Sequence, residues 1–245
     1  MISLHSDDFG YKNYSDKKII QLLRAGRIKS VSVLINMAGT RNLRSLLKLV
    51  RSRPEIKVGL HLNLIEGKSI NHQAYIPSIV YGRGNFFPLK KLIPRLLLKT
   101  VNSRHLEREI KSQVRILKQK GFKVSFIDSH QHLHAISPVA EIVNKVAIDE
   151  GIKVIRSYRK IKTYTLVAKS KYLILKTAAF FSYIVKYGKV GLPVSWNMKV
   201  NDSYAFMSWE SNSFDISRVK DKKLVFVTHP YLPFDTNKSY TWMLV

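Results

Sequence analysis

Short β-rich runs alternate with longer helical segments along most of the chain, and this order restricts the fold to a few classes. The β-rich runs lie at 2–5, 31–35, 58–64, 124–127, 153–155 and 224–227. Helical periodicity is found between them, at 17–24, 43–51, 89–98, 104–120 and 138–150. Strands separated by helices pair in parallel through crossover connections, so the pattern predicts an α/β barrel or a doubly wound sheet.

The length of the chain favours a single domain. Its 245 residues contain no internal repeat and no low-complexity linker, and an α/β barrel commonly takes this length as one unit. We therefore expect one domain over 1–245. A stretch at about 161–187 is apolar, basic and free of acids, and we interpret it as a helical insert.

Two features of the composition limit the chemistry and the location of the protein. The chain has no cysteine, so a metal would be held by His, Asp, Glu, backbone or water. The N-terminus MISLHSDDFG lacks the basic and apolar regions of a signal peptide. The most apolar window, 172–185, is shorter than the roughly 20 residues that a spanning helix needs. We expect a cytoplasmic protein.

Two adjacent carboxylates, Asp7 and Asp8, follow the first β-rich run. Like charges side by side are unfavourable unless something compensates them, and acids are scarce here, with 16 Asp and Glu against 42 Lys and Arg. A metal ion would bind one carboxylate and leave the other to handle a proton. The structural alternative is an Asx turn that ends the strand.

Histidines follow later strands in the same way. Alternation within GLHLNL at 59–64 places His61 and Asn63 on one face. The run at 124–127 is followed by a cluster of three histidines, His130, His132 and His134. One of them can be a metal ligand while the others contact substrate. We assign His130 as the ligand and expect Asn63, His132 and His134 to bind substrate. The structural alternative is a histidine-rich surface loop.

A fourth polar residue, His229, follows the run at 224–227. Catalytic groups of α/β barrels lie at the carboxyl ends of the strands, so four such ends carrying Asp or His indicate one site. Asp8, His61 and His130 would give a divalent metal three ligands and leave open positions. The metal would polarise a scissile carbonyl, Asp7 would act as the general base, and His229 would protonate the departing amine.

The ordered motifs resemble those of the YdjC/ChbG-like carbohydrate deacetylase family, which includes hopanoid-associated deacetylases. The resemblance rests on DDFG at 7–10, GLHLNL at 59–64, DSHQHLH at 128–134, IKVIR at 152–156 and HP at 229–230. It implies a distorted TIM-like β/α barrel related to the polysaccharide deacetylases. It also implies removal of an acetyl group from an N-acetylated sugar, such as a chitooligosaccharide or a glycolipid acetamido sugar.

The same resemblance assigns roles to individual residues. It places the metal, Zn2+ or Mg2+, on Asp8, His61 and His130, and the base on Asp7. Arg156 matches an arginine that would orient the base or bind substrate. Two histidine ligands favour zinc. The ligand set alone does not choose the bond, so hydrolysis of a phosphoester is an alternative chemistry, and a catalytically degenerate barrel that binds a carbohydrate or an anion is an alternative function.

The net charge of +26 predicts attraction to anions. No motif of the usual nucleic-acid-binding classes is present, so we do not expect nucleic acid as a partner, and solvated lysines are the simple alternative. The basic segment at 161–187 fits a helix at an anionic membrane surface, a lid or a partner surface. It fits equally a helix packed on the barrel with snorkelling lysines. The sequence leaves the oligomeric state open.

Overall fold

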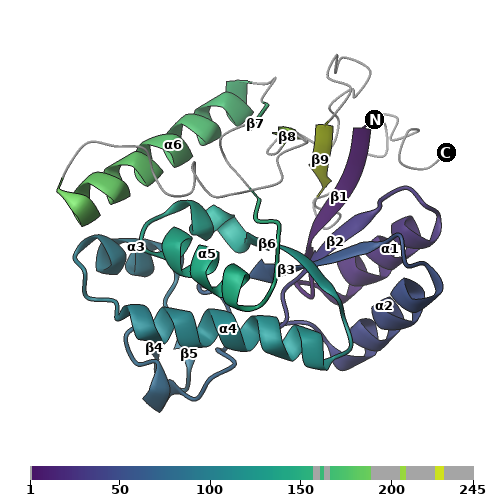
Figure 1. The fold of residues 1–245 in the computed structure, drawn as a ribbon, viewed down its shortest axis with the longest axis horizontal. Helices are drawn as coiled ribbons and strands as arrows, with labels where there is room; N and C mark the ends of the chain where they lie inside the picture. The colour runs from purple at the N-terminus through teal and green to yellow at the C-terminus, as the bar shows by residue number, and fades with distance from the viewer. Residues whose placement is uncertain (1, 157–160, 163–165, 189–204, 208–223, 229–245) are drawn as a thin grey trace.

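A parallel sheet forms the centre of the protein, as shown by the computed structural model (Figure 1). The structure describes residues 2–156, 161–162, 166–188, 205–207 and 224–228. Within them the sheet has seven strands in the order β6-β3-β2-β1-β9-β8-β7. The strands are β1 (Ile2–Phe9), β2 (Ser30–Val33), β3 (Lys57–Leu62), β6 (Val124–Ser129), β7 (Ile161–Lys162), β8 (Ala205–Met207) and β9 (Leu224–Thr228).

Every neighbouring pair of these seven strands is parallel. Parallel pairing brings the carboxyl ends of β1, β3 and β6 to one edge of the sheet. The predicted α/β class with a parallel sheet is therefore confirmed. In the described residues, β6 and β7 are the two edge strands of this sheet. On the outer side of β6, Ile127 forms one isolated parallel bridge with Ile155. Closure into a TIM-like barrel stays a prediction.

The helices in the described part of the chain surround the sheet or pack on the helices next to it (Figure 1). They are α1 (Asn13–Arg24), α2 (Thr40–Ser52), α3 (Leu89–Leu97), α4 (Ser103–Gln119), α5 (Val139–Asp149) and α6 (Leu166–Tyr187). In α4, Leu106, Ile110, Val114 and Leu117 recur at helical spacing and are fully buried. Two short 3-10 turns, η1 (Gln73–Tyr75) and η2 (His130–Ala135), and a hairpin of β4 (Val80–Tyr81) and β5 (Asn85–Phe86) complete the described elements.

The predicted insert at 161–187 divides into two parts in the structure. Ile161–Lys162 form strand β7 and pair with β8, whereas the helix α6 begins at Leu166. The two-residue strand is too short for its alternation to be visible in sequence. Figure 1 shows α6 on the outside of the molecule, beyond α5 and α3. None of the helices in the described part of the chain is long and apolar enough to cross a bilayer.

Candidate active site

The end of strand β1 is irregular at its two carboxylates. Asp7 and Asp8 are both 1% exposed. Successive side chains of a regular strand point to opposite faces, but the β1–β2 register shifts between Ser6 and Phe9, and Asp8 has a left-handed φ of 62°. Such backbone costs on the order of 1–3 kcal/mol for a residue other than glycine and is typical of functional sites.

The turn after these carboxylates requires its glycine. Gly10 has a φ of +104°, and a Cβ built on it would lie 2.7 Å from the Cβ of Ala38. Its N–H donates to Oδ1 of Asp16 at 2.6 Å, which ties the turn to α1. The motif DDFG therefore encodes a strand end that is fixed on both sides of Asp8.

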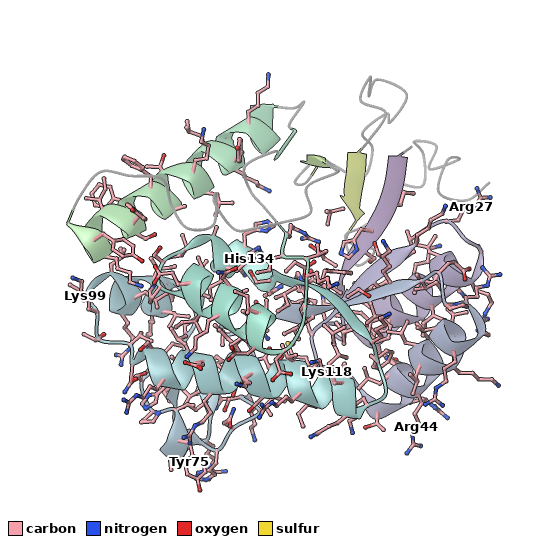
Figure 2. All side chains as sticks on the ribbon, viewed as in Figure 1. Arg27, Arg44, Tyr75, Lys99, Lys118 and His134 are labelled. Atoms are coloured by element: carbon pink, nitrogen blue, oxygen red, sulfur yellow. The ribbon has the colours of Figure 1, made fainter. Side chains whose placement is uncertain are left out.

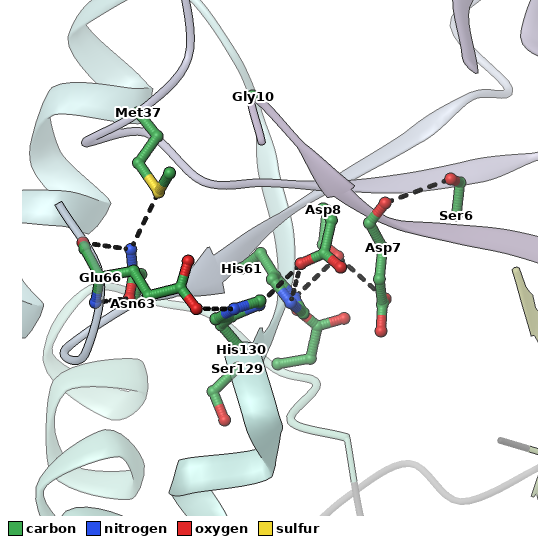
Figure 3. Close-up of polar contacts among 12 residues, drawn as sticks. Ser6, Asp7, Asp8, Gly10, Met37, His61, Asn63, Glu66, Ser129 and His130 are labelled. Atoms are coloured by element: carbon green, nitrogen blue, oxygen red, sulfur yellow. Dashed lines mark hydrogen bonds and ion pairs between the residues drawn. The ribbon is translucent and has the colours of Figure 1, made fainter. Parts of the chain in front are cut away.

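Asp8, His61 and His130 converge on one point (Figure 3). Nε2 of His61 is 3.0 Å, and Nδ1 of His130 is 2.8 Å, from the same oxygen, Oδ1 of Asp8. Their three candidate ligand atoms all lie within 4.8 Å of one another, and all three residues are buried. Two imidazoles and a carboxylate form a donor set that fits zinc and similar divalent ions.

Asp128, at the end of β6, orients His61. Its Oδ1 is 2.6 Å from Nδ1 of His61, which directs Nε2 toward Asp8. A carboxylate on the second nitrogen of a metal-binding histidine commonly fixes the ring and its tautomer. Burial opposes a charge on His61, but the carboxylates of Asp128 and Asp7 outweigh it and raise the pKa of His61 to about 10. The same carboxylates would favour a bound cation.

Arg156 joins Asp7 to Asp128. Its guanidinium donates to both oxygens of Asp7, at 2.8 and 2.6 Å, and its Nη2 is 2.6 Å from Oδ2 of Asp128. Burial alone would raise the pKa of Asp7, but Arg156 and His61 hold it well below its usual value. Asp7 is therefore ionised and held in one orientation.

A second group, His5, Asp7 and Asp128, also has the composition of a metal site. Arg156 already places a positive charge between its two carboxylates. Nε2 of His5 is 2.7 Å from Oδ1 of Asp7, and the hydroxyl of Ser32 donates to the same oxygen at 3.2 Å. These contacts make the second group a scaffold for Asp7, and they leave the first group as the candidate metal centre.

Glu66 borders the metal group on the side of His130. Its Oε1 is 3.3 Å from Nε2 of His130, so each of the two histidines has a carboxylate on the nitrogen opposite Asp8. The side chain of Glu66 is 33% exposed, unlike the buried acids around it. The Glu66 carboxylate also faces Tyr11; burial and then this charge raise the pKa of the Tyr11 hydroxyl.

Asn63 holds the loop that carries Glu66. Its amide oxygen accepts from the N–H groups of Ile65 and Glu66, each at 3.1 Å, and its amide nitrogen donates to the carbonyl of Glu66 at 2.8 Å. Asn63 is 0% exposed. These contacts show that Asn63 shapes the loop, and its expected role in substrate binding stays a prediction.

The remaining predicted histidines fall in different places. His134 is fully buried; its Nδ1 bonds to the Ser129 hydroxyl and its Nε2 donates to the carbonyl of Arg156 at 2.9 Å. Both of its ring nitrogens therefore have partners inside the protein, and its role in substrate binding stays a prediction. His132 is half-buried in a left-handed turn with φ of 58°, and its role in substrate binding stays a prediction. His229 lies outside the described residues.

Four residues of this site were not expected from the sequence: His5, Ser32, Glu66 and Asp128. His5 and Asp7 lie two residues apart on one face of β1, and Asp128 lies two residues before His130. Both spacings could have indicated a cluster. Ser32 and Glu66 reach the site through the parallel pairing of β2 with β1 and through the loop after β3, which the sequence pattern does not specify.

Comparison with known proteins identifies relatives of this chain. The chain is 30% identical over 151 residues to a carbohydrate deacetylase of Brevibacillus brevis (62% of this chain, 57% of that protein). It is 32% identical over 148 residues to a carbohydrate deacetylase of Danio rerio (60% of this chain, 46% of that protein). The matches therefore span less than two thirds of the length of these relatives.

A solved structure has the same fold. The crystal structure of a cellobiose-phosphate cleavage protein of Enterococcus faecalis matches with a TM-score of 0.62 and 17% identity, over 93% of this chain and 80% of that one.

A family profile establishes the family of the chain. The profile described as YdjC-like protein matches residues 1–236. This match includes every motif that carried the resemblance, from Asp7 and Asp8 to His229. The chain belongs to the YdjC-like protein family.

Proposed function

We propose that the protein is a metal-dependent carbohydrate N-deacetylase that hydrolyses the acetamide of an N-acetylated sugar. The observation that carries the proposal is the convergence of Asp8, His61 and His130 next to Asp7, a carboxylate fixed by Arg156. The relatives described as carbohydrate deacetylases support the acetamide as the bond that is cleaved. A chitooligosaccharide or the acetamido sugar of a glycolipid is the proposed substrate class.

The proposed metal is one divalent ion, Zn2+ or Mg2+, held by Asp8, His61 and His130. Such an ion would supply a Lewis acid for an amide carbonyl and for water. The two imidazoles favour zinc, because magnesium prefers an all-oxygen set of ligands. Asp128 and Glu66 would keep the two imidazole rings in place, since each contacts the nitrogen that faces away from Asp8.

Asp7 is the proposed general base. Its pKa is held below the usual range because Arg156 and His61 outweigh the effect of burial, so the carboxylate is available to accept a proton over the whole neutral range. Arg156 acts as a positioning residue, because it binds both oxygens of Asp7 and leaves the carboxylate a single orientation. His5 and Ser32 contact the same oxygen and restrict it further.

Two roles in the reaction stay predictions from the sequence. His229 is proposed to protonate the departing amine, and His132 is proposed to contact the sugar. Glu66 is a third candidate for contact with the sugar, because it adjoins His130 and is partly exposed. Its backbone is held by Asn63 and by Asn36, whose amide donates to the Glu66 carbonyl at 3.1 Å.

Acetate release tests the proposed function. The purified full chain, loaded with zinc or magnesium, is incubated with N-acetylglucosamine oligomers, and acetate and metal content are measured separately. We expect turnover by the wild type, loss of bound metal in His61→Ala, and retained metal without turnover in Asp7→Asn. His72→Ala, a substitution of an exposed histidine on another loop, is the matched control and should change neither quantity.

The two measurements separate the rival functions. A wild type that binds one metal per chain and releases no acetate from any acetamido sugar would refute the deacetylase and support a degenerate barrel that binds carbohydrate or anions. Metal-dependent release of phosphate from a phosphorylated sugar, without acetate release, would support a phosphoesterase instead. Turnover that persists in His61→Ala would refute the assigned metal site.

A further inference from the structure

The outer face of α6 differs from the outer faces of the other helices. Three large apolar side chains of α6 are mostly exposed: Leu173 (65%), Ile174 (68%) and Phe181 (61%). Pairs of these three residues are separated by one, seven and eight positions, and seven or eight residues make about two helical turns, so the three side chains form one stripe along the helix. Thr177 and Ala178, between them in this stripe, are also exposed.

The other long surface helices provide an internal comparison. In α2 the exposed residues are Thr40, Arg41, Arg44, Ser45, Lys48, Arg51 and Ser52, and in α4 they are Ser103, Arg104, Arg108, Arg115 and Gln119. Both helices therefore follow the usual pattern, with an apolar face on the core and a polar face outside. The apolar stripe of α6 does not follow from packing against the core, and it needs a separate explanation.

The opposite face of α6 already packs against the protein. Ala179 is buried in the main core, and Tyr172 and Leu175 pack against Ala135. Ser182 accepts a hydrogen bond from the N–H of Ser137 at 3.2 Å, and Lys186 pairs with Glu141 at the end of the helix. Since these contacts fix the rotation of α6 about its axis, the stripe faces outward. Figure 1 shows α6 at the periphery of the molecule.

Positive charge surrounds the stripe. Lys169, Lys171 and Lys176 are exposed along α6, and the chain has no Asp or Glu between Glu150 and Asp202. The neighbouring helix α3 contacts α6 and also combines exposed cations with an exposed apolar side chain: Lys90 and Lys91 lie in α3, and Leu98 follows its last residue. Apolar side chains bordered by lysines are the pattern of a helix that lies in the interface of an anionic bilayer.

We propose that the outer face of α6 binds the surface of an anionic phospholipid bilayer, with the stripe inserted at the headgroup level and the lysines on the phosphates. The occupant is a bilayer and not a second copy of the chain, because each copy carries a net charge of +26. A symmetric dimer would oppose lysines to lysines, whereas anionic lipid neutralises them. This proposal is independent of the acetamide chemistry.

Co-sedimentation of the full chain with vesicles tests the proposal. The vesicles contain phosphatidylcholine with phosphatidylglycerol, or phosphatidylcholine alone, at low and at physiological salt. We expect binding to the anionic vesicles that weakens as salt rises, because the Debye length falls to about 8 Å at physiological ionic strength. Absence of binding to anionic vesicles at low salt would overturn the proposal.

Two sets of variants separate the α6 face from the general charge of the chain. Replacing Lys169, Lys171 and Lys176 by Gln should weaken binding about fivefold per lysine, on the order of 100-fold together. The matched control replaces Arg41, Arg44 and Lys48, three exposed cations of α2, by Gln as well and should have a much smaller effect (Figure 2 labels Arg44 on this helix). An equal loss in both sets would show attraction by net charge alone and would refute a specific face.

The apolar stripe has its own variant, in which Leu173, Ile174 and Phe181 are replaced by Gln. We expect it to lose vesicle binding while circular dichroism and the thermal midpoint stay near those of the wild type, since the side chains are exposed. Unchanged binding would refute insertion of the stripe. Light scattering that shows a wild-type dimer, abolished by this variant, would identify a second copy as the occupant and would overturn the proposal as well.

Discussion

Replacing His134 with glutamine probes a histidine that the fold keeps neutral. His134 is 0% exposed. Its Nε2 donates to the carbonyl of Arg156, so its Nδ1 must accept from the Ser129 hydroxyl, whose oxygen already accepts the N–H of His134 at 3.0 Å. A second proton on the ring would turn the Ser129 hydroxyl from a donor to Nδ1 into an acceptor, and it would place a charge in the interior. Burial accordingly lowers the pKa of His134 to about 4, although the Arg156 carbonyl and Asp128 oppose the shift.

The shift predicts how stability depends on pH. The unfolded chain binds a proton on this histidine near its ordinary pKa of about 6.5, while the folded chain does so only near 4. Neutral His134 therefore makes its full contribution to the free energy of unfolding above about pH 6.5. This contribution decreases as the pH falls from about 6.5 to about 4, and the free energy of unfolding does not change further through this group at lower pH. Between pH 7.5 and pH 5 the linkage relation gives a loss of about 2 kcal/mol.

The glutamine variant cannot titrate, so it isolates this contribution. At pH 7.5 we expect the free energy of unfolding of His134→Gln to be about 1–3 kcal/mol lower than that of the wild type, because the Ser129 hydroxyl loses its histidine partner. At pH 5 the difference in free energy of unfolding between the two proteins should be about 2 kcal/mol smaller, because only the wild type loses stability through His134. The carboxylates are the same in both proteins and affect both equally. Urea unfolding of metal-free protein measures both gaps, with His72→Gln as a control. An equal gap at both pH values would show that His134 is not held neutral by burial.

Three further substitutions test the contacts around the site. Asp128→Asn should weaken zinc binding about 10- to 100-fold in calorimetry, because the amide no longer fixes the ring of His61. Arg156→Met should lower the free energy of unfolding of the metal-free chain by about 3–5 kcal/mol in urea titrations, since the buried carboxylate of Asp7 loses its partner. The buried carboxylate of Glu109 accepts four hydrogen bonds, from Ile70, Asn71 and Gln113. Glu109→Ala should therefore lower the free energy of unfolding by about 1–3 kcal/mol, measured by thermal unfolding.

The strands that the sequence predicts well are those whose side chains alternate over several residues or are apolar throughout. The runs at 58–64 and 124–127 fall on β3 and β6 for this reason. The first strand extends beyond the predicted 2–5 to Phe9, because the polar residues in its second half are buried against partners from distant parts of the chain, such as Arg156 on Asp7 and His130 on Asp8. Strand β7 has only two residues, and its pairing with β8 depends on a distant part of the chain.

The part of the site that could be predicted is the part in which each residue follows a strand on its own. Asp8, His61 and His130 meet because parallel strands end at the same edge. The contacts between residues of different strands could not be predicted. Asp128 lies beside His61 because β6 pairs with β3, and Glu66 lies beside His130 because of the path of the loop after β3. The contacts of Asn63 with the backbone of its loop could not be predicted for the same reason, because alternation indicates a face but not whether a loop closes over that face.

Charge balance connects the two halves of the site. Asp7, Asp8 and Asp128 are buried carboxylates, and Arg156 compensates one of their three negative charges. With neutral imidazoles the cluster would carry two uncompensated charges in the interior, which is unfavourable at low dielectric. A divalent cation between Asp8 and the histidines compensates both, whereas a monovalent ion compensates one. The pairing of Arg156 with Asp7 and Asp128 would therefore do more than orient the proposed base. It leaves Asp8 as the carboxylate that faces the proposed metal position, and with neutral imidazoles the remaining charge is the one that a divalent ion would neutralise.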